Sequence, residues 1–480
     1  MGFETKGKSP QQRQTVQGHA SSNGRNLSQV QVQGSTLTVN VFFDGTKNNL
    51  YNIEDRRKNT TKYANKDKDD YESYFNDYSN VAHLFNSRAR RIPRTSWVYI
   101  EGIGTGANDI NEEDRKRIQA AAQSQQASKE QKRKLYTDST KGFAMGSGST
   151  GIKQRVEQSF EKIQTQVRGD HGTIIPAIIR LNVFGFSRGA AAARYFIHLV
   201  KSQPQRFKGW NLKSANITVG FVGLFDTVSS YHPGMMIPEY KVIERERDLF
   251  EDVSELHLNF SRGYADKVFH ITALDEYRKY FSLTTIRSAV KQGFGFEVAL
   301  NGAHADIGGS YPNNSKESFM ASGDAASLLK RWFVKQGFYT DEQTSYKAQV
   351  SIKDEHGKNF YTPATLYVSR SSVSNHYHKV PFKAMRLMAE KYAVNVQFDK
   401  DKAEKIEQSP HKEIQSLLNT MPAKIMRAAA NGWGQSINMA LPESYAKAFR
   451  NRFIHWSAKN ETGYELRLKD GLPYRKTHQG

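Results

Sequence analysis

The 480-residue chain contains no cysteine, and it has no long uninterrupted apolar run. The absence of cysteine excludes disulfide bonds, thiolate metal sites and a cysteine nucleophile. The apolar stretch 173–186 is broken by Pro176 and Arg180, so no segment approaches the roughly 20 apolar residues that a membrane-spanning helix requires. Residues 1–26 are polar and lack the apolar core of a secretory signal, so we expect synthesis in the cytoplasm without a signal peptide.

Acidic residues are few relative to basic ones. The 69 lysines and arginines outnumber the 48 aspartates and glutamates, which gives a formal net charge of +21. A surplus of this size favours anionic partners, such as nucleic acid or an anionic membrane surface, and does not indicate a fold. No nucleic-acid-binding motif is present and the basic residues are dispersed, so we expect no nucleic-acid partner. A basic nucleic-acid-binding protein and a solvated basic surface with no partner are the alternatives.

Between about residues 36 and 340, apolar runs alternate with helical patterns. The apolar runs include "STLTVNVFF", "SWVYIEG", "IIRLNVFGF", "ANITVGFVGLFD", "KVFHITALDE" and "FEVALNG". Continuous apolar strands separated by helices are typical of an α/β fold with a mostly parallel sheet and helices on both faces. We assign 36–340 to this domain, with a charged insertion at 111–141, and 1–35 to a flexible polar tail. Residues 341–480 are predicted to form a smaller, mainly helical region, a candidate lid or membrane-docking module.

A serine flanked by glycines lies where a strand runs into an alanine-rich helix. Gly185, Ser187 and Gly189 form a G-x-S-x-G pattern between an apolar strand that ends at 186 and a helix predicted over 188–201. In a nucleophile elbow, the tight turn lifts the serine hydroxyl to the carboxyl edge of the sheet. The amide of Arg188, at the helix N-terminus, can then face a developing oxyanion. The alternative is a glycine-permitted turn with an N-cap serine.

A nucleophilic serine needs a base, and the base needs an acid that orients it. Asp226 ends the strand "VGFVGLFD", and His304 follows the strand "FEVALNG" in the glycine-rich loop "NGAHADIGGSY". The order serine, aspartate, histidine, with each residue at a strand end, is that of the α/β-hydrolases. We therefore predict a triad of Ser187, Asp226 and His304. Asp226 as a turn aspartate, and His304 as a surface or core histidine, are the structural alternatives.

Other histidines and one other aspartate compete for these roles. His270 lies inside a predicted strand, His257 in a predicted helix, and His232 too close after Asp226 to belong to a different strand. Asp306 is an alternative acid, but it follows His304 by only two residues, and we expect it to stabilise the glycine turn.

A second oxyanion donor is expected from another strand end. In "FFDGTKNN", Asp44 organises a turn whose Gly45 and Thr46 amides are accessible candidates, although a plain turn explains the pattern nearly as well. The Gly-rich run 142–151 lacks the G-K-[ST] of a phosphate-binding loop, and the histidines show no metal-ligand spacing such as H-E-x-x-H. The sequence therefore predicts neither a cofactor nor a metal.

Five ordered blocks carry a family resemblance. They are "VFFDGTKNN", "FGFSRGAAAAR", "VGLFDTVSS", "HITALDEYRKYF" and "NGAHADIGGSY". Together they resemble the α/β-hydrolase domain of the type VI secretion lipase effectors, first family, over about 38–340. Weaker similarity continues through "KVPFKAMRLMAEKYAV" and "FIHWSA". The resemblance implies an antibacterial toxin with phospholipase A activity (A1 or A2), and it places Ser187, Asp226 and His304 on the family's triad positions.

The resemblance also implies a place of action and partners. Such effectors are delivered by a contractile secretion machine into the periplasm of a target cell, which needs no signal peptide. The implied partners are membrane phospholipids, a component of the type VI apparatus and a periplasmic immunity protein. Longer relatives carry large additional C-terminal regions, whereas this chain has only about 140 residues after position 340. A soluble carboxylesterase remains the enzymatic alternative.

Overall fold

The computed structural model describes residues 36–60, 72–105, 151–230, 254–353, 355–356, 358–461 and 464–480. The predicted tail 1–35, the predicted insertion 111–141 and His232 lie outside the described residues.

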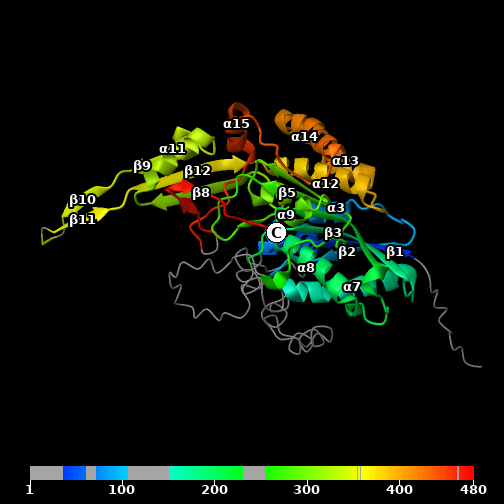
Figure 1. Ribbon diagram of the computed structural model, residues 1–480. Coiled ribbons are helices and arrows are strands. Elements are labelled where there is room, and N and C mark those ends of the chain that lie inside the picture. The colour runs from blue at the N-terminus through cyan, green and yellow to red at the C-terminus, as the bar shows by residue number, and fades with distance from the viewer. Residues whose placement is uncertain are drawn as a thin grey trace, which may run out of the picture.

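A seven-stranded sheet forms the centre of the protein (Figure 1). Its spatial order is β13 (Gln435–Asn438), β7 (Gly295–Leu300), β5 (Lys267–Ala273), β4 (Ile217–Phe225), β3 (Ile178–Phe186), β1 (Thr36–Phe43) and β2 (Thr95–Ile100). Every neighbouring pair is parallel. The central strands are buried almost throughout because helices cover both faces, which explains their continuous apolar sequences. The predicted α/β class with a mostly parallel sheet is confirmed.

Helices cover the two faces of the sheet, as Figure 1 shows. On one face, α7 (Ile152–His171) packs against α8 (Arg188–Ser202), and α8 contacts β1, β3 and β4. On the other, α3 (Asn80–Asn86) and α12 (Lys379–Tyr392) contact the sheet, and α14 (Lys412–Asn431) packs on α12. Each face therefore has its own apolar core.

The segment after residue 340 is more closely joined to the sheet than the sequence predicts. The predicted helical content is present, for example in α12 and α15 (Glu443–Phe453). The segment also supplies the edge strand β13, the antiparallel strands β9 (Thr344–Lys347) and β12 (Thr365–Val373), and the hairpin β10 (Val350–Lys353) with β11 (Asn359–Thr362). Because β13 and α12 pack on the main sheet, the boundary at 340 does not divide two packing units.

The remaining α-helices and strands are at most 11 residues long. They are α1 (Leu50–Arg57), α2 (Glu72–Phe75), β6 (Leu283–Thr284), α9 (Arg287–Lys291), α10 (His304–Gly308), β8 (Ser315–Ser322), α11 (Ala326–Gln336), α13 (Lys400–Ile406), β14 (Leu468–Lys469), β15 (Leu472–Pro473) and β16 (Thr477–His478). Strand β8 pairs with β12, and β16 pairs in parallel with β6. Among the described helices, none is both long and apolar enough to cross a membrane.

Candidate active site

Ser187 occupies a strained turn between β3 and α8. Its backbone angles are φ 60° and ψ −131°, a conformation that costs a residue with a side chain about 1–3 kcal/mol. The Ser187 amide donates to the carbonyl of Phe225, 3.0 Å away, so the turn is held beside the end of β4. A strained serine between a parallel strand and a helix is typical of a nucleophile elbow.

The glycines at this turn permit backbone-to-backbone contact. A Cβ atom on Gly189 would lie 2.1 Å from the carbonyl oxygen of Asp44, and one on Gly185 would lie 2.6 Å from the Cα of Ala190. Both contacted atoms belong to the backbone, so a larger residue at position 185 or 189 would have to displace the backbone of Ala190 or Asp44. The sequence pattern therefore reflects the space available at the turn, as well as its conformation.

Replacement of Gly189 by alanine is expected to destabilise the protein. The added Cβ overlaps the backbone of Asp44, and overpacking of this kind costs about 1–3 kcal/mol. Gly169→Ala is the matched control, because Gly169 lies in α7 with nothing within 4 Å of an added Cβ. That change should be neutral or stabilising by up to about 1 kcal/mol. Chemical denaturation measures both variants, and equal stabilities would contradict the packing described for the elbow.

Asp226 and His304 meet at the same edge of the sheet. Asp226 follows β4 directly with φ 40° and is fully buried, and its Oδ2 lies 2.6 Å from Nδ1 of His304. His304 follows β7 and begins the five-residue helix α10, where the sequence predicts a loop. The ring of Phe186, the residue before Ser187, lies 4.7 Å from the His304 ring between centroids. The three predicted residues thus follow the carboxyl ends of parallel strands: Ser187 follows β3, Asp226 follows the adjacent β4, and His304 follows β7, which is separated from β4 by β5.

The electrostatics suit a neutral histidine beside a permanently ionised aspartate. Burial alone raises the pKa of Asp226, but the Arg475 guanidinium and the hydrogen bond from His304 together hold that pKa well below its usual value. Burial lowers the pKa of His304, and the contact with Asp226 offsets only part of that effect. At neutral pH, Nδ1 therefore donates to Asp226, and Nε2 is the nitrogen available to accept a proton.

Glu276 and Arg278 form a second layer that the sequence analysis did not assign. Glu276 accepts three hydrogen bonds from Arg278, one from its amide and two from its guanidinium, each 2.9 Å long, and one of 3.2 Å from the His304 amide. Burial alone raises the pKa of Glu276, but the paired Arg278 guanidinium, together with Arg475 and His304, lowers it to about 2. Both residues stand in "HITALDEYRKYF", one of the five blocks of the resemblance. The resemblance of that block to the family therefore marked this stretch as important. The residue types alone did not predict an ion pair between Glu276 and Arg278 next to His304.

Asp306 has a different partner. Its Oδ1 lies 2.6 Å from Nδ1 of His455, and its Oδ2 accepts from the amides of Ala303 and His455. Tyr311 stacks over the His455 ring at 4.1 Å between centroids. Asp306 therefore fixes the turn before α10 to the segment "FIHWSA", which agrees with the structural role expected for it.

The turn after β1 lies against the elbow, but its two candidate amides differ. The Gly45 amide donates to Oδ1 of Asp44 at 2.7 Å, and the Tyr99 hydroxyl donates to Oδ2 at 2.5 Å. Gly45 is thus already engaged. In the part of the chain that the structure describes, neither the amide nor the buried hydroxyl of Thr46 has a hydrogen-bond partner. Thr46 therefore remains the candidate oxyanion donor in this turn, together with Arg188 at the start of α8.

The competing histidines have other contacts. His270 lies in β5 as predicted, with Nδ1 2.9 Å from Glu297, and its Nε2 accepts from the Thr227 amide. His257 does not lie in a helix as predicted. It follows the 3₁₀ turn Ser254–Leu256 with φ 45°, and its ring stacks on that of His198 at 4.1 Å.

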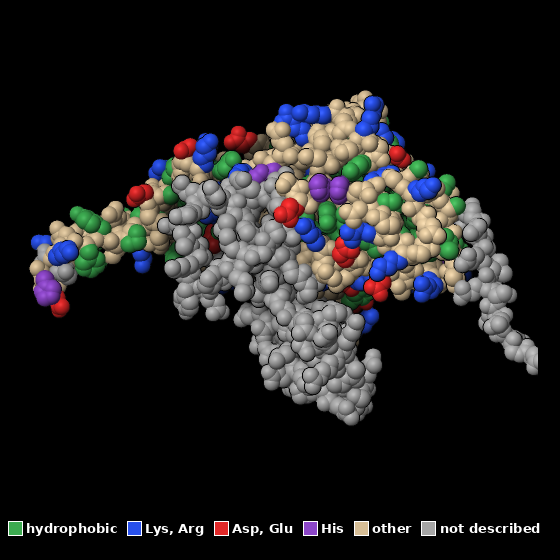
Figure 2. Space-filling view, turned by 60° about the horizontal axis from the view of Figure 1, so that its bottom comes forward, with side chains coloured by type: hydrophobic (Ala, Val, Ile, Leu, Met, Phe, Trp, Pro, Cys, Tyr) green, Lys and Arg blue, Asp and Glu red, His purple; other side chains and the backbone are tan. Residues whose placement is uncertain are grey.

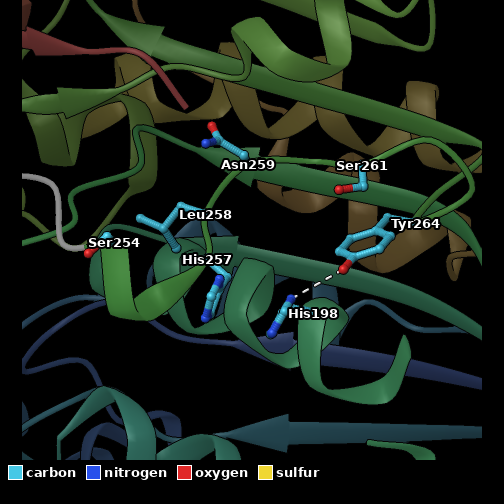
Figure 3. Close-up of a pocket in the computed structure, with 7 residues that line it drawn as sticks. All are labelled: His198, Ser254, His257, Leu258, Asn259, Ser261 and Tyr264. Atoms are coloured by element: carbon cyan, nitrogen blue, oxygen red, sulfur yellow. Dashed lines mark hydrogen bonds between the residues drawn. The ribbon is translucent and has the colours of Figure 1, made fainter. Parts of the chain in front are cut away.

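The stacked pair His198 and His257 lines a hollow of about 400 Å³ (Figure 3). His198 is on α8, roughly 16 Å along the helix from Ser187. No residue of the predicted triad lines this hollow. Among the described residues, no group of three histidine or carboxylate side chains is arranged to hold a metal ion.

The parallel sheet, the strained serine and the His–Asp pair at the carboxyl edge of that sheet define an α/β-hydrolase-like protein. Residues 200–336 match the family model for the catalytic domain of Tle1-like type VI secretion phospholipase effectors. The match confirms the predicted resemblance to type VI secretion lipase effectors. It contains Asp226 and His304 and begins after Ser187. No curated protein matches the chain.

The solved structures that match the chain include the following two. The Tle1 effector bound to the VgrG spike from the type VI secretion system is 20% identical with a TM-score of 0.59, and the match covers 96% of this chain and 98% of that one. This likeness supports the fold. An uncharacterized protein from Pseudomonas aeruginosa is 15% identical with a TM-score of 0.36, over 86% of this chain and 52% of that one.

Proposed function

We propose that the protein is a serine-dependent phospholipase A that hydrolyses acyl esters of membrane glycerophospholipids, and that it acts as an antibacterial type VI secretion effector. The observation that carries the proposal is the short Asp226–His304 hydrogen bond at the strand ends beside the strained Ser187. The match of residues 200–336 to a phospholipase effector catalytic domain supports the choice of substrate.

The proposed reaction begins with formation of an acyl-enzyme. Nε2 of His304 removes the proton from the Ser187 hydroxyl as that oxygen attacks the acyl carbonyl. The amides of Arg188 and Thr46 stabilise the tetrahedral oxyanion. His304 then protonates the departing oxygen of the lysophospholipid, which leaves the acyl group on Ser187.

A water molecule completes the cycle. His304 removes a proton from the water as its oxygen attacks the acyl-enzyme, and returns that proton to Ser187 as the fatty acid leaves. Asp226 keeps the imidazole in the required tautomer and stabilises its cation in both steps.

Delivery and partners are proposed by analogy. The solved Tle1 effector is bound to a VgrG spike, and we propose that a spike protein of this kind carries the present chain. The proposed place of action is the periplasm of the target cell, with a periplasmic immunity protein protecting the producer.

The hairpin of β10 and β11 supports the proposed membrane-docking role for 341–480, because it extends from the body in Figure 1 and exposes Val350, Ile352 and Phe360.

Binding to anionic vesicles should weaken as salt rises. Figure 2 shows Lys and Arg side chains spread over the visible face and interspersed with acidic ones, and the net charge is +21. Each basic residue near an anionic surface contributes about 1 kcal/mol, and salt limits the reach of surface charge to about 8 Å at physiological ionic strength. Vesicle co-sedimentation across a salt series measures the effect. Equally strong, salt-independent binding to neutral vesicles would contradict it.

Product analysis tests the proposed activity. Vesicles of mixed phospholipids incubated with the protein should yield free fatty acids and lysophospholipids, identified by mass spectrometry. Hydrolysis of short water-soluble esters without attack on vesicles would favour a soluble carboxylesterase. Retention on DNA that exceeds retention on anionic vesicles and falls with salt would favour the nucleic-acid alternative.

A further inference from the structure

We propose that Arg475 is a positioning residue for the hydrolysis: it fixes the carboxylate of Asp226 and, through it, the imidazole of His304. The inference rests on the proposed function, because it takes Asp226 and His304 as the acid and the base. Arg475 lies 249 residues after Asp226 in the chain, in a segment that the sequence analysis gave no catalytic role.

The contact between Arg475 and Asp226 is bidentate and buried. Nη1 donates to Oδ1 and Nη2 donates to Oδ2, each at 2.8 Å, and the two side chains are 9% and 0% exposed. Paired N–H···O bonds from a planar guanidinium fix the plane of a carboxylate as well as its position. The two bonds from Arg475 therefore set the orientation of the Asp226 carboxylate, which a single hydrogen bond would not do.

The remaining lone pairs of Asp226 are also used. Oδ1 accepts from the Ala273 amide at 2.9 Å, and Oδ2 accepts from Nδ1 of His304 at 2.6 Å. With Arg475 these bonds give each carboxylate oxygen two donors. Rotation of the carboxylate would break at least one charged hydrogen bond, so His304 meets an acceptor of fixed direction.

Arg475 is itself held in place by backbone contacts. Its Nε donates to the carbonyl of Phe281 at 3.0 Å, and Nη1 also donates to the carbonyl of Ala273 at 2.9 Å. The segment after Arg475 is paired with the chain at 283–288, where the Leu283 amide donates to the Lys476 carbonyl at 3.0 Å and the Ser288 amide donates to that of Gly480 at 2.7 Å. These contacts direct the guanidinium to Asp226.

The charge of Arg475 also affects the pH dependence of the site. Its guanidinium is the main attraction that lowers the pKa of Asp226 against burial. The other charged groups that face His304 are Glu276, which raises the pKa of His304, and Arg278, which lowers it. Without Arg475, the pKa of Asp226 rises. The pKa of His304 also rises, because the negative charge beside it is no longer offset. Protonation of either group stops catalysis, so both changes move the acidic limb of activity to higher pH.

The test compares Arg475→Met with the wild-type protein on a short p-nitrophenyl ester across pH. We expect kcat to fall by about 10- to 100-fold with KM within about two-fold, as when an outer partner of a functional histidine is lost. The acidic limb of kcat/KM should move up by about one pH unit. A purely structural role would lower the folded fraction without moving that limb.

Two further variants provide controls. Arg475→Lys keeps the charge but loses the paired contact, so kcat should fall several-fold while the acidic limb stays near that of the wild type. Arg467→Met should behave as wild type, because Arg467 contacts the carbonyl of Lys279 and lies outside the Asp226 contact. Should Arg475→Met fail to fold, Arg475→Lys decides, since a wild-type kcat for that variant would overturn the proposal.

Ser187→Ala, measured alongside, separates this inference from the proposed function. If Ser187→Ala retains wild-type hydrolysis, the serine mechanism fails. If Ser187→Ala is inactive and a folded Arg475→Met keeps the kcat and acidic limb of the wild type, only the role of Arg475 is overturned.

Discussion

Ser187→Ala should remove phospholipid hydrolysis almost completely. The proposed attacking oxygen is lost, and deletion of a triad nucleophile lowers kcat by on the order of 10⁵- to 10⁶-fold. The fold should be preserved, because alanine is smaller than serine and the turn is held by the Ser187 backbone amide, which donates to the Phe225 carbonyl in either variant. Release of fatty acid from phospholipid vesicles measures the loss, and circular dichroism and thermal unfolding check the fold.

Ser202→Ala is a matched control for this change. Ser202 ends the same helix α8, and its hydroxyl donates to the His198 carbonyl within the helix. That variant should hydrolyse phospholipid at the wild-type rate. Hydrolysis by Ser187→Ala at a rate near that of Ser202→Ala would remove Ser187 from the mechanism.

The same variant tests the place of action. Wild-type protein expressed with an added export signal should injure a bacterial cell, and the same protein kept in the cytoplasm should do so far less. Exported Ser187→Ala should be tolerated at equal abundance, as judged by immunoblotting of periplasmic extracts. Toxicity confined to cytoplasmic expression would contradict periplasmic action and favour the nucleic-acid alternative.

Asp226→Asn should have the second-largest effect. An amide cannot hold the required tautomer of His304 or stabilise its cation, and a change of this kind lowers kcat by about 10⁴-fold in a serine triad. The asparagine also places a neutral group against the buried Arg475, so some loss of stability is expected with the loss of activity. Steady-state kinetics and thermal unfolding measure the two effects separately.

Asp306→Asn is the informative comparison for Asp226→Asn. Both aspartates are buried and lie 2.6 Å from a histidine nitrogen, but Asp306 is paired with His455 instead of His304. We expect Asp306→Asn to reduce stability and to leave most of the turnover of the folded protein. Near-normal turnover for Asp226→Asn combined with loss for Asp306→Asn would reverse the assignment of the acid.

The main sheet is predictable because its strands are continuous apolar runs. Strands β3 and β4 are buried on both faces, so their sequences contain the expected apolar residues, and Ser187 and Asp226 directly follow them. Strand β13 is not predictable in this way. It is a four-residue edge strand, "QSIN", whose side chains are partly or fully exposed, and its pairing with β7 gives it a place in the sheet.

The contacts that hold the three candidate residues in place are less predictable from the sequence than the three residues themselves. The G-x-S-x-G pattern and the strand ends identify Ser187, Asp226 and His304 as candidates because local geometry demands those residue types. The contact between Arg475 and Asp226 depends on how the segment after β15 pairs with residues 283–288, and no local pattern encodes that contact. The hydrogen bond from the Gly45 amide to the Asp44 side chain depends on the conformation of one turn, so the sequence did not predict it either.

A fluorophosphonate probe, which phosphonylates activated serines, shows whether Ser187 is a nucleophile activated by His304 and Asp226. The modified protein is digested and the labelled peptide is identified by mass spectrometry. We expect stoichiometric labelling at Ser187 in the wild type, much slower labelling at the same position in Asp226→Asn, and no label in Ser187→Ala. Labelling of another residue at the same rate in the wild type and in Ser187→Ala, with Ser187 unmodified, would contradict this role of Ser187.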